Sequence, residues 1–235
     1  MALKAPTVTQ ENDHEMFFRW YCEELIEFGY LKRIIREAEM LSVFPKQTHK
    51  IEKHYKSSKP NGTEEITLLQ ETNYTYDFLL VWEEKAINIF TEQYDPDTHF
   101  VFGKPVFISH KVMLDTGIEL VSYIDVKPHI AAVTFGGGKM SSYYTFPLIQ
   151  KYLMFSKGLF INKAIPIHSG KHGRSTCLFA VTFVPNRYRY TDKSGALRAI
   201  PYRKKSITSY TSQREAIIKE LLSFKANKES QQSLL

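Results

Sequence analysis

The chain has 235 residues, of which 43% are hydrophobic, 24% charged and 14% aromatic. This composition excludes the disordered and fibrous classes and predicts a packed core, which we interpret as one domain with a tail. Lys and Arg outnumber Asp and Glu by 31 to 25, so the net charge is +6, which favours an anionic partner, with nucleic acid the leading candidate.

The first expected element is a helix from His14 to about Phe28. Its apolar residues recur at helical spacing, Asn12 or Asp13 can cap its start, and Gly29 can end it. A basic stretch follows, in which Pro45 and a turn at 60–62 interrupt regular structure. We expect at most a short strand there, near Ser42–Phe44.

From Glu65 the sequence becomes typical of strands, because β-branched and aromatic residues dominate. We expect these segments to be neighbouring strands of one sheet: EITLLQETNYTYDFLLVW, KAINIF, PVFISHKVM, IELVSYIDVK and IAAVTF. Between them Glu92–Lys104 is largely polar, which indicates a loop or the start of an inserted lobe. GGGK at 136–139 indicates a flexible connection.

A second helix is expected from Ser142 to Gly158, with Pro147 tolerated near its first turn. The strand LFINKAIPI follows directly, which gives the order strand, helix, strand that a parallel crossover requires. CLFAVTFV predicts a further strand and YRYTDKSGALRAI a hairpin. A last helix is expected from about Ser212 to Lys225, with a frayed end.

Neither a disulfide framework nor a zinc site is indicated, because Cys22 and Cys177 lie far apart and outside any CxxC or Cys/His pattern. Residues 1–12 lack a signal pattern, and no apolar run approaches the roughly 18 residues that a membrane span needs. We therefore expect a cytoplasmic protein without a membrane partner.

Two carboxylates stand where an apolar strand would ordinarily carry Val or Ile. Asp77 opens DFLLVW, and Asp125 lies inside VSYIDVK. Burying such a charge is costly unless something binds it. Side chains two apart on a strand share a face, so Lys127 lies on the side of Asp125, and Val126 faces the opposite side. Carboxylates on adjacent strands can hold one divalent ion, which activates water and neutralises charge on a phosphate.

The chain resembles the core of the PD-(D/E)xK nuclease superfamily over roughly residues 12–167, about two-thirds of its length. The motifs that carry the resemblance are YTYDFLLVW, then YIDVKP, a helix and FINKAIP. The resemblance implies an α/β fold with a central mixed β-sheet flanked by helices, a restriction-endonuclease-like core. It implies a single nuclease domain over 1–210, with a C-terminal helix and frayed tail over 211–235. Asp77 and Asp125 are 48 residues apart, which we attribute to an insertion at about 92–118 that includes PVFISHKVM.

The resemblance also supplies the site. Glu15 on the first helix would complete a magnesium site with Asp77, Asp125 and the carbonyl of Val126, and manganese can replace magnesium. Glu24 is the alternative to Glu15, although Glu23, Glu24 and Glu27 fit a solvated helix face. Lys127 would orient the nucleophile or stabilise the transition state. If the insertion is misplaced, the partner carboxylate is instead one of three others: Asp95, Asp97 or Asp115.

Contacts with DNA phosphates are predicted on the crossover helix and in two basic, flexible stretches. The residues are Gln150 and Lys151 on the helix, and Lys139, Lys171, His172 and Arg174 in the stretches. The groups RYRY at 187–190 and YRKK at 202–205 add tyrosines that can stack on unpaired bases.

The sequence thus predicts a Mg²⁺-dependent endonuclease acting on DNA, by analogy with phage-type resolvases and recombination nucleases on branched DNA. If a phage encodes the chain, it would act in the host cytoplasm. If the enzyme cuts both strands of a duplex, a homodimer with one active site per strand is expected. The rivals are a sequence-specific restriction-type endonuclease and a non-catalytic DNA-binding or virion-associated protein that keeps the fold.

Overall fold

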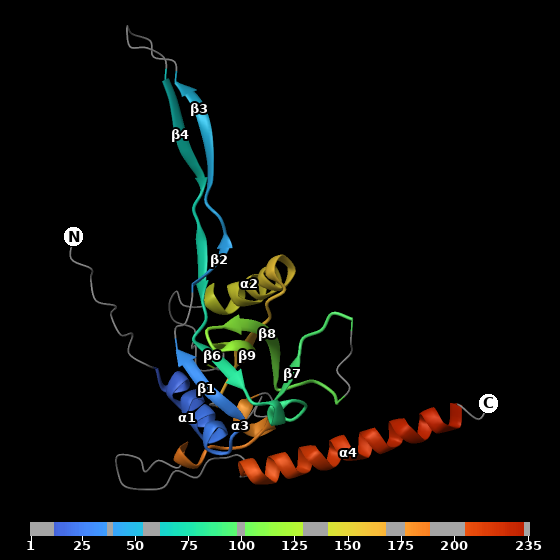
Figure 1. Cartoon of the computed structure of the whole chain (residues 1–235). Coiled ribbons are helices and arrows are strands. Elements are labelled where there is room, and N and C mark those ends of the chain that lie inside the picture. The colour runs from blue at the N-terminus through green and yellow to red at the C-terminus, as the bar shows by residue number, and fades with distance from the viewer. Residues whose placement is uncertain are drawn as a thin grey trace, which may run out of the picture.

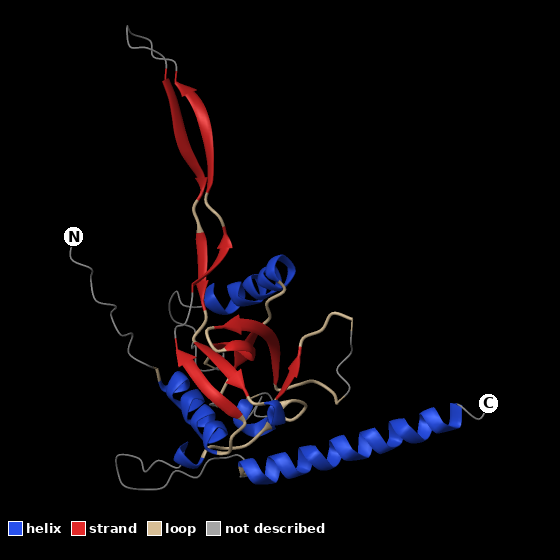
Figure 2. Ribbon diagram, in the orientation of Figure 1, coloured by secondary structure: helices blue, strands red, loops and turns tan. Residues whose placement is uncertain are grey.

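The computed structural model describes residues 12–36, 40–53, 62–97, 102–128, 141–167, 177–188 and 205–232. In these ranges the chain is a mixed α/β protein with a central mixed six-stranded sheet and four α-helices, the last of them C-terminal (Figures 1 and 2). The predicted fold class is therefore confirmed at this level.

The central sheet is antiparallel over most of its width. Its strand order is β1 (Leu31–Arg36), β6 (Phe78–Trp82), β9 (Gly117–Val126), β8 (Phe107–Leu114) and β7 (Thr91–Gln93), and β10 (Ile161–Ala164) pairs with β9. The first four of these strands run antiparallel to their neighbours, whereas β7 is parallel to β8 and β10 is parallel to β9.

Strand β9 changes its neighbour half-way along one edge. Residues 117–121 pair with β8, and residues 123–126 pair with β10. The amide of Asn162 in β10 fills the junction, because it accepts from the Ile108 N–H at 2.8 Å and donates to the carbonyls of Ile108 and Tyr123. Backbone groups that lose a strand partner are thereby still hydrogen-bonded.

Helices cover both faces of the sheet, as the alternation of its buried side chains requires. Phe78, Leu80 and Ile124 pack with α1 (Asp13–Glu27) and the short α3 (Leu178–Val181) in one core. The intervening Leu79 and Tyr123 belong to a second core with α2 (Ser141–Lys157). The site described below lies on the α2 face.

Two predicted helices and the crossover are confirmed. The Asn12 side chain accepts from the N–H groups of His14 and Glu15, so it caps α1, and Gly29 follows the helix with φ 67°. Helix α2 connects β9 to the parallel strand β10, with Pro147 inside the helix.

A long β-hairpin arm, described over residues 40–53 and 62–75, projects from the body between β1 and β6 (Figure 1). It consists of two ladders, β2 (Met40–Phe44) with β5 (Thr72–Thr75) and β3 (Gln47–Lys53) with β4 (Gly62–Leu69). The prediction of at most one strand before residue 62 is therefore wrong, and β4 and β5 do not belong to the central sheet. Most described side chains of β3 and β4 are exposed, so the arm has no buried face to create an apolar alternation.

Three local predictions between the arm and the C-terminus are wrong. KAINIF is a turn rather than a strand, with a 3-10 segment, η1 (Glu84–Ala86), and Asn88 at φ 67°, a conformation that Asn tolerates. CLFAVTFV contains the helix α3, since a short apolar run does not distinguish helix from strand. Glu92 and Gln93 lie in β7 rather than in a loop, whereas the prediction of PVFISHKVM as a strand of the same sheet is confirmed, because it forms β8.

Helix α4 (Ile207–Gln232) is longer than predicted at both ends, and it continues through most of the segment expected to fray. Its first turns pack on the body through Ile207 and Tyr210, and the remainder extends away (Figure 1). Among the described residues no helix is long and apolar enough to cross a membrane. The predicted strand IAAVTF, the GGGK connection and the hairpin at 189–199 lie outside the described residues.

Candidate active site

The three side chains at the centre of the sequence prediction lie together where β6 begins and β9 ends. Asp77 precedes β6, and its N–H donates to the Ile124 carbonyl at 2.9 Å. Its Oδ2 accepts the N–H of Val126 at 2.6 Å. On β9, Lys127 Nζ donates to Asp125 Oδ1 at 2.8 Å. The antiparallel register of β6 and β9 thus brings together two carboxylates from segments 48 residues apart.

Asp125 is a buried charge with an unused acceptor. The residue is 2% exposed, and its Oδ2 has no hydrogen-bond donor in suitable geometry among the described residues. The hydroxyl of Tyr74, at the root of the arm on β5, is buried beside this carboxyl. Burial, the charge of Asp125 and the contact of the hydroxyl with the Asp125 carboxyl raise the pKa of Tyr74. The acceptor capacity left on Asp125 Oδ2 is what a further group could use.

Asp77 holds a proton more tightly than an ordinary carboxyl. Burial, together with the charge of Asp125, raises its pKa from 3.8 to about 7, although the Val126 N–H and the Lys127 ammonium act in the opposite direction. Two close carboxylates with one lysine thus carry more negative charge than the site compensates. A bound cation would remove that imbalance, so the donor set fits a divalent metal.

Lys127 is held in place by contacts other than its ion pair with Asp125. Its ammonium lies 5.9 Å from the centre of the Phe146 ring on α2, and its backbone N–H donates to the Ala164 carbonyl of β10. The side chain is 19% exposed, so it can still reach a ligand from solvent.

Glu15 contributes charge to the site through space. It forms an ion pair with Arg36 of β1 at 3.0 Å and accepts a hydrogen bond from the Asn12 side chain. Its charge also raises the pKa of Asp77. Among the described residues no three His, Cys, Asp or Glu side chains are grouped closely enough to hold a metal ion. The structure therefore places two of the predicted carboxylates together, and direct ligation by Glu15 stays a prediction.

The alternative Glu24 has a structural position instead. It is 6% exposed, so its assignment to a solvated helix face is wrong, and it accepts from the backbone N–H of Asn186 at 2.8 Å. That contact ties α1 to the residues after α3.

The other candidate carboxylates lie elsewhere. Asp115 is in the turn between β8 and β9, at the opposite end of β9 from Asp125. Asp95 accepts from the N–H of Asp97 in the connection after β7. Asp77 is therefore the carboxylate that accompanies Asp125. The side chain of Val126 packs in the α1 core, opposite the site, as predicted, and metal binding by its carbonyl stays a prediction.

Of the predicted DNA contacts, only those on α2 lie in described ranges. Lys151 is exposed, whereas Gln150 donates to the Ile161 carbonyl at 2.6 Å, which anchors α2 to β10. The remaining four lie outside the described residues: Lys139, Lys171, His172 and Arg174.

Comparison with known proteins gives no match: no family model, no curated protein and no solved structure is similar to this chain. The chemistry of the site therefore rests on its own geometry.

Two residues near the site were not anticipated from the sequence, Tyr74 and Arg36. Tyr74 lies three residues before Asp77 in a run of alternating polar and aromatic residues. Its place in the site could have been inferred if the arm had been predicted. Arg36 gave no such signal, because the preceding stretch was not expected to enter the central sheet.

Proposed function

We propose that the chain is a metal-dependent endonuclease of the PD-(D/E)xK type that hydrolyses DNA. The observation that carries the proposal is the convergence of Asp77, Asp125 and Lys127 on one face, with a buried carboxylate oxygen left without a hydrogen bond among the described residues. Buried acceptors are normally hydrogen-bonded, so an unsatisfied one beside a second carboxylate and a lysine supports a ligand-binding role.

The order of elements supports the same reading. Helix α1 is followed by the strands β1, β6 and β9, each antiparallel to the one beside it, then by the crossover helix α2 and the parallel strand β10. Asp77 directly precedes the second of these strands and Asp125 lies near the end of the third, so both are at the same end of the sheet. This is the arrangement that the sequence resemblance implies. The β7–β8 unit is the addition that separates the two carboxylates along the chain, and the arm is a further addition between β1 and β6.

Asp77 and Asp125 would hold Mg²⁺ or Mn²⁺, with Glu15 acting on the site as a third negative charge. The ion would supply an activated water and neutralise charge on the scissile phosphate. Lys127 is placed to donate to that water or to a phosphate oxygen once its contact with Asp125 loosens.

The proposed substrate is DNA with a branched or otherwise marked structure, and the biological role would be phage-type recombination, repair or DNA processing. Net charge +6 supports an anionic substrate. The branched structure rests on the resemblance. A sequence-specific restriction-type enzyme is the nearest alternative within this chemistry.

The test is cleavage of a supercoiled plasmid and of a synthetic four-way junction, each with Mg²⁺, Mn²⁺ or EDTA. Asp125→Asn should abolish metal-dependent cleavage, whereas Asp115→Asn, the same chemical change at an exposed turn, should preserve it. Binding of DNA by the wild type without cleavage in any metal would overturn the enzymatic proposal and support a DNA-binding module. Cleavage of the junction in preference to the plasmid would support the branched substrate.

A further inference from the structure

We propose a second ligand site in this chain, a cavity for a nucleoside phosphate between α4 and β10. The cavity has a volume of about 590 Å³, within the usual range for small-molecule sites. It is separate from the carboxylate pair, and the proposal stands independently of nuclease activity.

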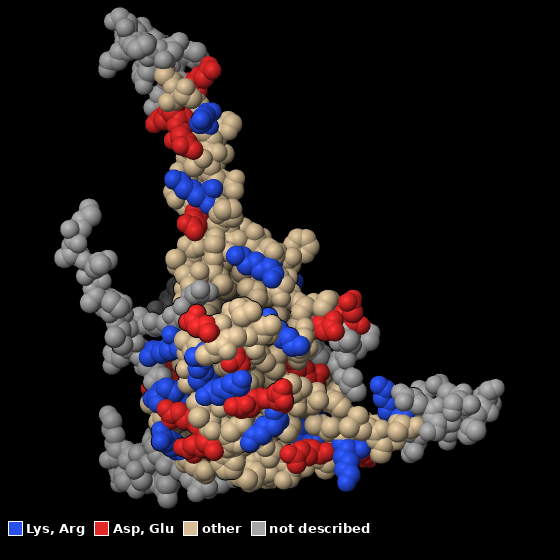
Figure 3. All heavy atoms as spheres, viewed as in Figure 1, with Lys and Arg blue, Asp and Glu red and all other residues tan. Residues whose placement is uncertain are grey.

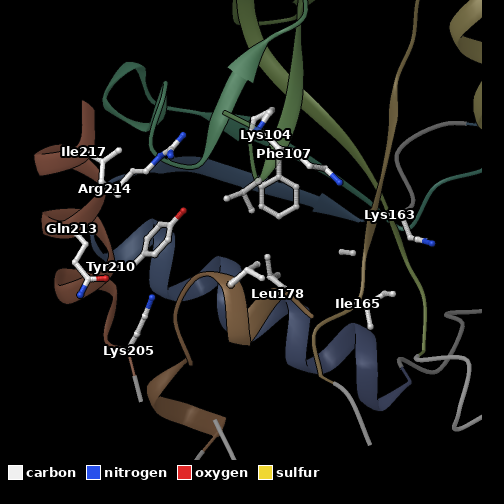
Figure 4. Close-up of a pocket in the computed structure, with 14 residues that line it drawn as sticks. Lys104, Phe107, Lys163, Ile165, Leu178, Lys205, Tyr210, Gln213, Arg214 and Ile217 are labelled. Carbon is white, nitrogen blue, oxygen red and sulfur yellow. The ribbon is translucent and has the colours of Figure 1, made fainter. Parts of the chain in front are cut away.

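The cavity walls come from four elements, α4, β10, β8 and α3 (Figure 4). Tyr210 and Arg214 of α4 lie on one side, and Lys163 of β10 lies on the other. Phe107 of β8 and Leu178 of α3 form the wall between them. The first turns of α4 are fixed by core packing and by a hydrogen bond from the Tyr210 hydroxyl to the Ile89 carbonyl, so the cavity belongs to the folded body.

The charge lining the cavity has one sign. Among the described residues, four basic side chains and no carboxylate line it: Lys104, Lys163, Lys205 and Arg214. The face of the molecule in Figure 3 looks different, because basic and acidic side chains intermingle there. A group of cations in a lining of this kind creates a local positive potential and favours an anion.

The donors are available for a ligand. Within the described ranges, the ammonium groups of Lys104 and Lys205 make no hydrogen bond and no ion pair. Arg214 donates Nε to the Asn88 carbonyl at 3.0 Å and Nη2 to the Phe102 carbonyl at 2.8 Å, which fixes the guanidinium in place. A guanidinium carries five N–H donors, so others remain beyond these two contacts. The carboxyl of Glu92 lies near Arg214 but not in the cavity lining, and burial raises its pKa, which reduces its competing charge.

The walls also specify the rest of the ligand. Apolar side chains face the cavity between the cations, including Val106, Ile165, Val181 and Ile217. A carboxylate needs one cation, whereas a phosphomonoester carries nearly two negative charges and accepts from several donors at once. The three cations shown above to have donors available, together with an apolar interior, therefore favour a phosphate attached to a weakly polar body, as in a nucleoside phosphate.

Two sources supply this chemistry, a free mononucleotide and the 5′-phosphorylated end of a DNA strand. The second source requires the strand to pass from one face of the sheet to the other, because Ala164 in the cavity lining pairs with Val126, whose side chain faces away from Asp125. Only this second source would connect the cavity to the proposed nuclease.

The experiment measures binding of dAMP, deoxyadenosine and inorganic phosphate by calorimetry in EDTA, where no cleavage occurs. We expect dAMP to bind at least about tenfold more tightly than either of the other two, because it alone uses both the cations and the apolar walls. A second series compares a 5′-phosphorylated oligonucleotide with its 5′-hydroxyl counterpart. If the phosphorylated strand binds more tightly than both the 5′-hydroxyl strand and dAMP, DNA is the source of the phosphate. If the phosphorylated strand binds no more tightly than dAMP, the mononucleotide is the source.

Lys104→Gln combined with Lys205→Gln should weaken dAMP binding by about tenfold and reduce its salt dependence. Lys50→Gln on the arm, an exposed lysine remote from the cavity, is the matched control and should leave binding within about twofold. Val181→Trp should block the cavity from its exposed rim without burying new charge. Binding that is unchanged in both the lysine double variant and Val181→Trp would overturn the proposal, as would equal affinity for deoxyadenosine and dAMP. Asp125→Asn should bind dAMP as the wild type does, so loss of nuclease activity and loss of this site are distinguishable.

Discussion

Replacing Asp77 by Asn should stabilise the metal-free protein at high pH and leave it unchanged at low pH. The folded state raises the pKa of Asp77 from 3.8 to about 7, with burial as the largest cause. Below pH 3.8 both states hold the proton, so the group contributes nothing to pH dependence. Between the two values the unfolded chain releases a proton that the folded chain keeps, and above pH 7 the folded state carries the full penalty of a buried charge.

The size of the effect follows from the shift. One pKa unit corresponds to about 1.4 kcal/mol, so a shift of roughly 3 units sets an upper limit of about 4 kcal/mol at pH 8. Relaxation and residual solvent contact reduce it, and we expect about 1 to 4 kcal/mol. For a chain of this length each kcal/mol raises the melting temperature by about 2 to 4 °C. Asn keeps an oxygen that can accept from the Val126 N–H, so the change removes charge with little loss of hydrogen bonding.

The assay is thermal and urea unfolding of the wild type and Asp77→Asn in EDTA from pH 4.5 to pH 8.5. Asp115→Asn is the control, because that carboxyl is exposed at a turn. The reasoning is refuted if the stability difference between Asp77→Asn and the wild type does not grow as the pH rises, or if Asp115→Asn shows the same growth.

Three further predictions concern the same surroundings. Tyr74→Phe should destabilise the metal-free protein by about 1 kcal/mol in urea unfolding, because it removes a buried donor that contacts the Asp125 carboxyl; a gain of stability would contradict this. Asn162→Ala should cost roughly 1 to 3 kcal/mol, measured in the same way, since the Ile108 N–H loses its acceptor, whereas the Ile108 carbonyl keeps the Ser122 hydroxyl as a donor; a neutral result would contradict this. Mg²⁺ affinity should rise by up to about tenfold per pH unit below pH 7 and level off above it, because the ion competes with the proton on Asp77. Calorimetry in buffers of different ionisation enthalpy should detect that proton, and Asp77→Asn should abolish its release.

The candidate site was more predictable than the fold around it. A charge inside an apolar strand is a strong local signal, since burying it is costly, and Asp77 and Asp125 each carry that signal. The shared face of Asp125 and Lys127 follows from strand geometry alone. The pairing of β6 with β9 is not local, but both carboxylates lie at the ends of strongly apolar segments that must join the same core.

The arm could not be predicted by the same reasoning. Strand prediction relies on one apolar face, and β3 and β4 have solvent on both sides, so their sequence alternates only weakly. Their pairing depends on backbone hydrogen bonds and on cross-strand contacts such as that between Thr48 and Glu65. α3 was missed for a different reason, because a single turn of helix has too few residues to show a period.

The change of neighbour along β9 has a mechanical consequence. At Asp125 the strand is hydrogen-bonded on both edges, to β10 on one side and to the start of β6 on the other. Sliding this carboxylate by even one residue would break two ladders at once. This end of the sheet is therefore a fixed template, and any ligand larger than an ion must adapt its own shape to it or be accommodated by movement of the projecting hairpin.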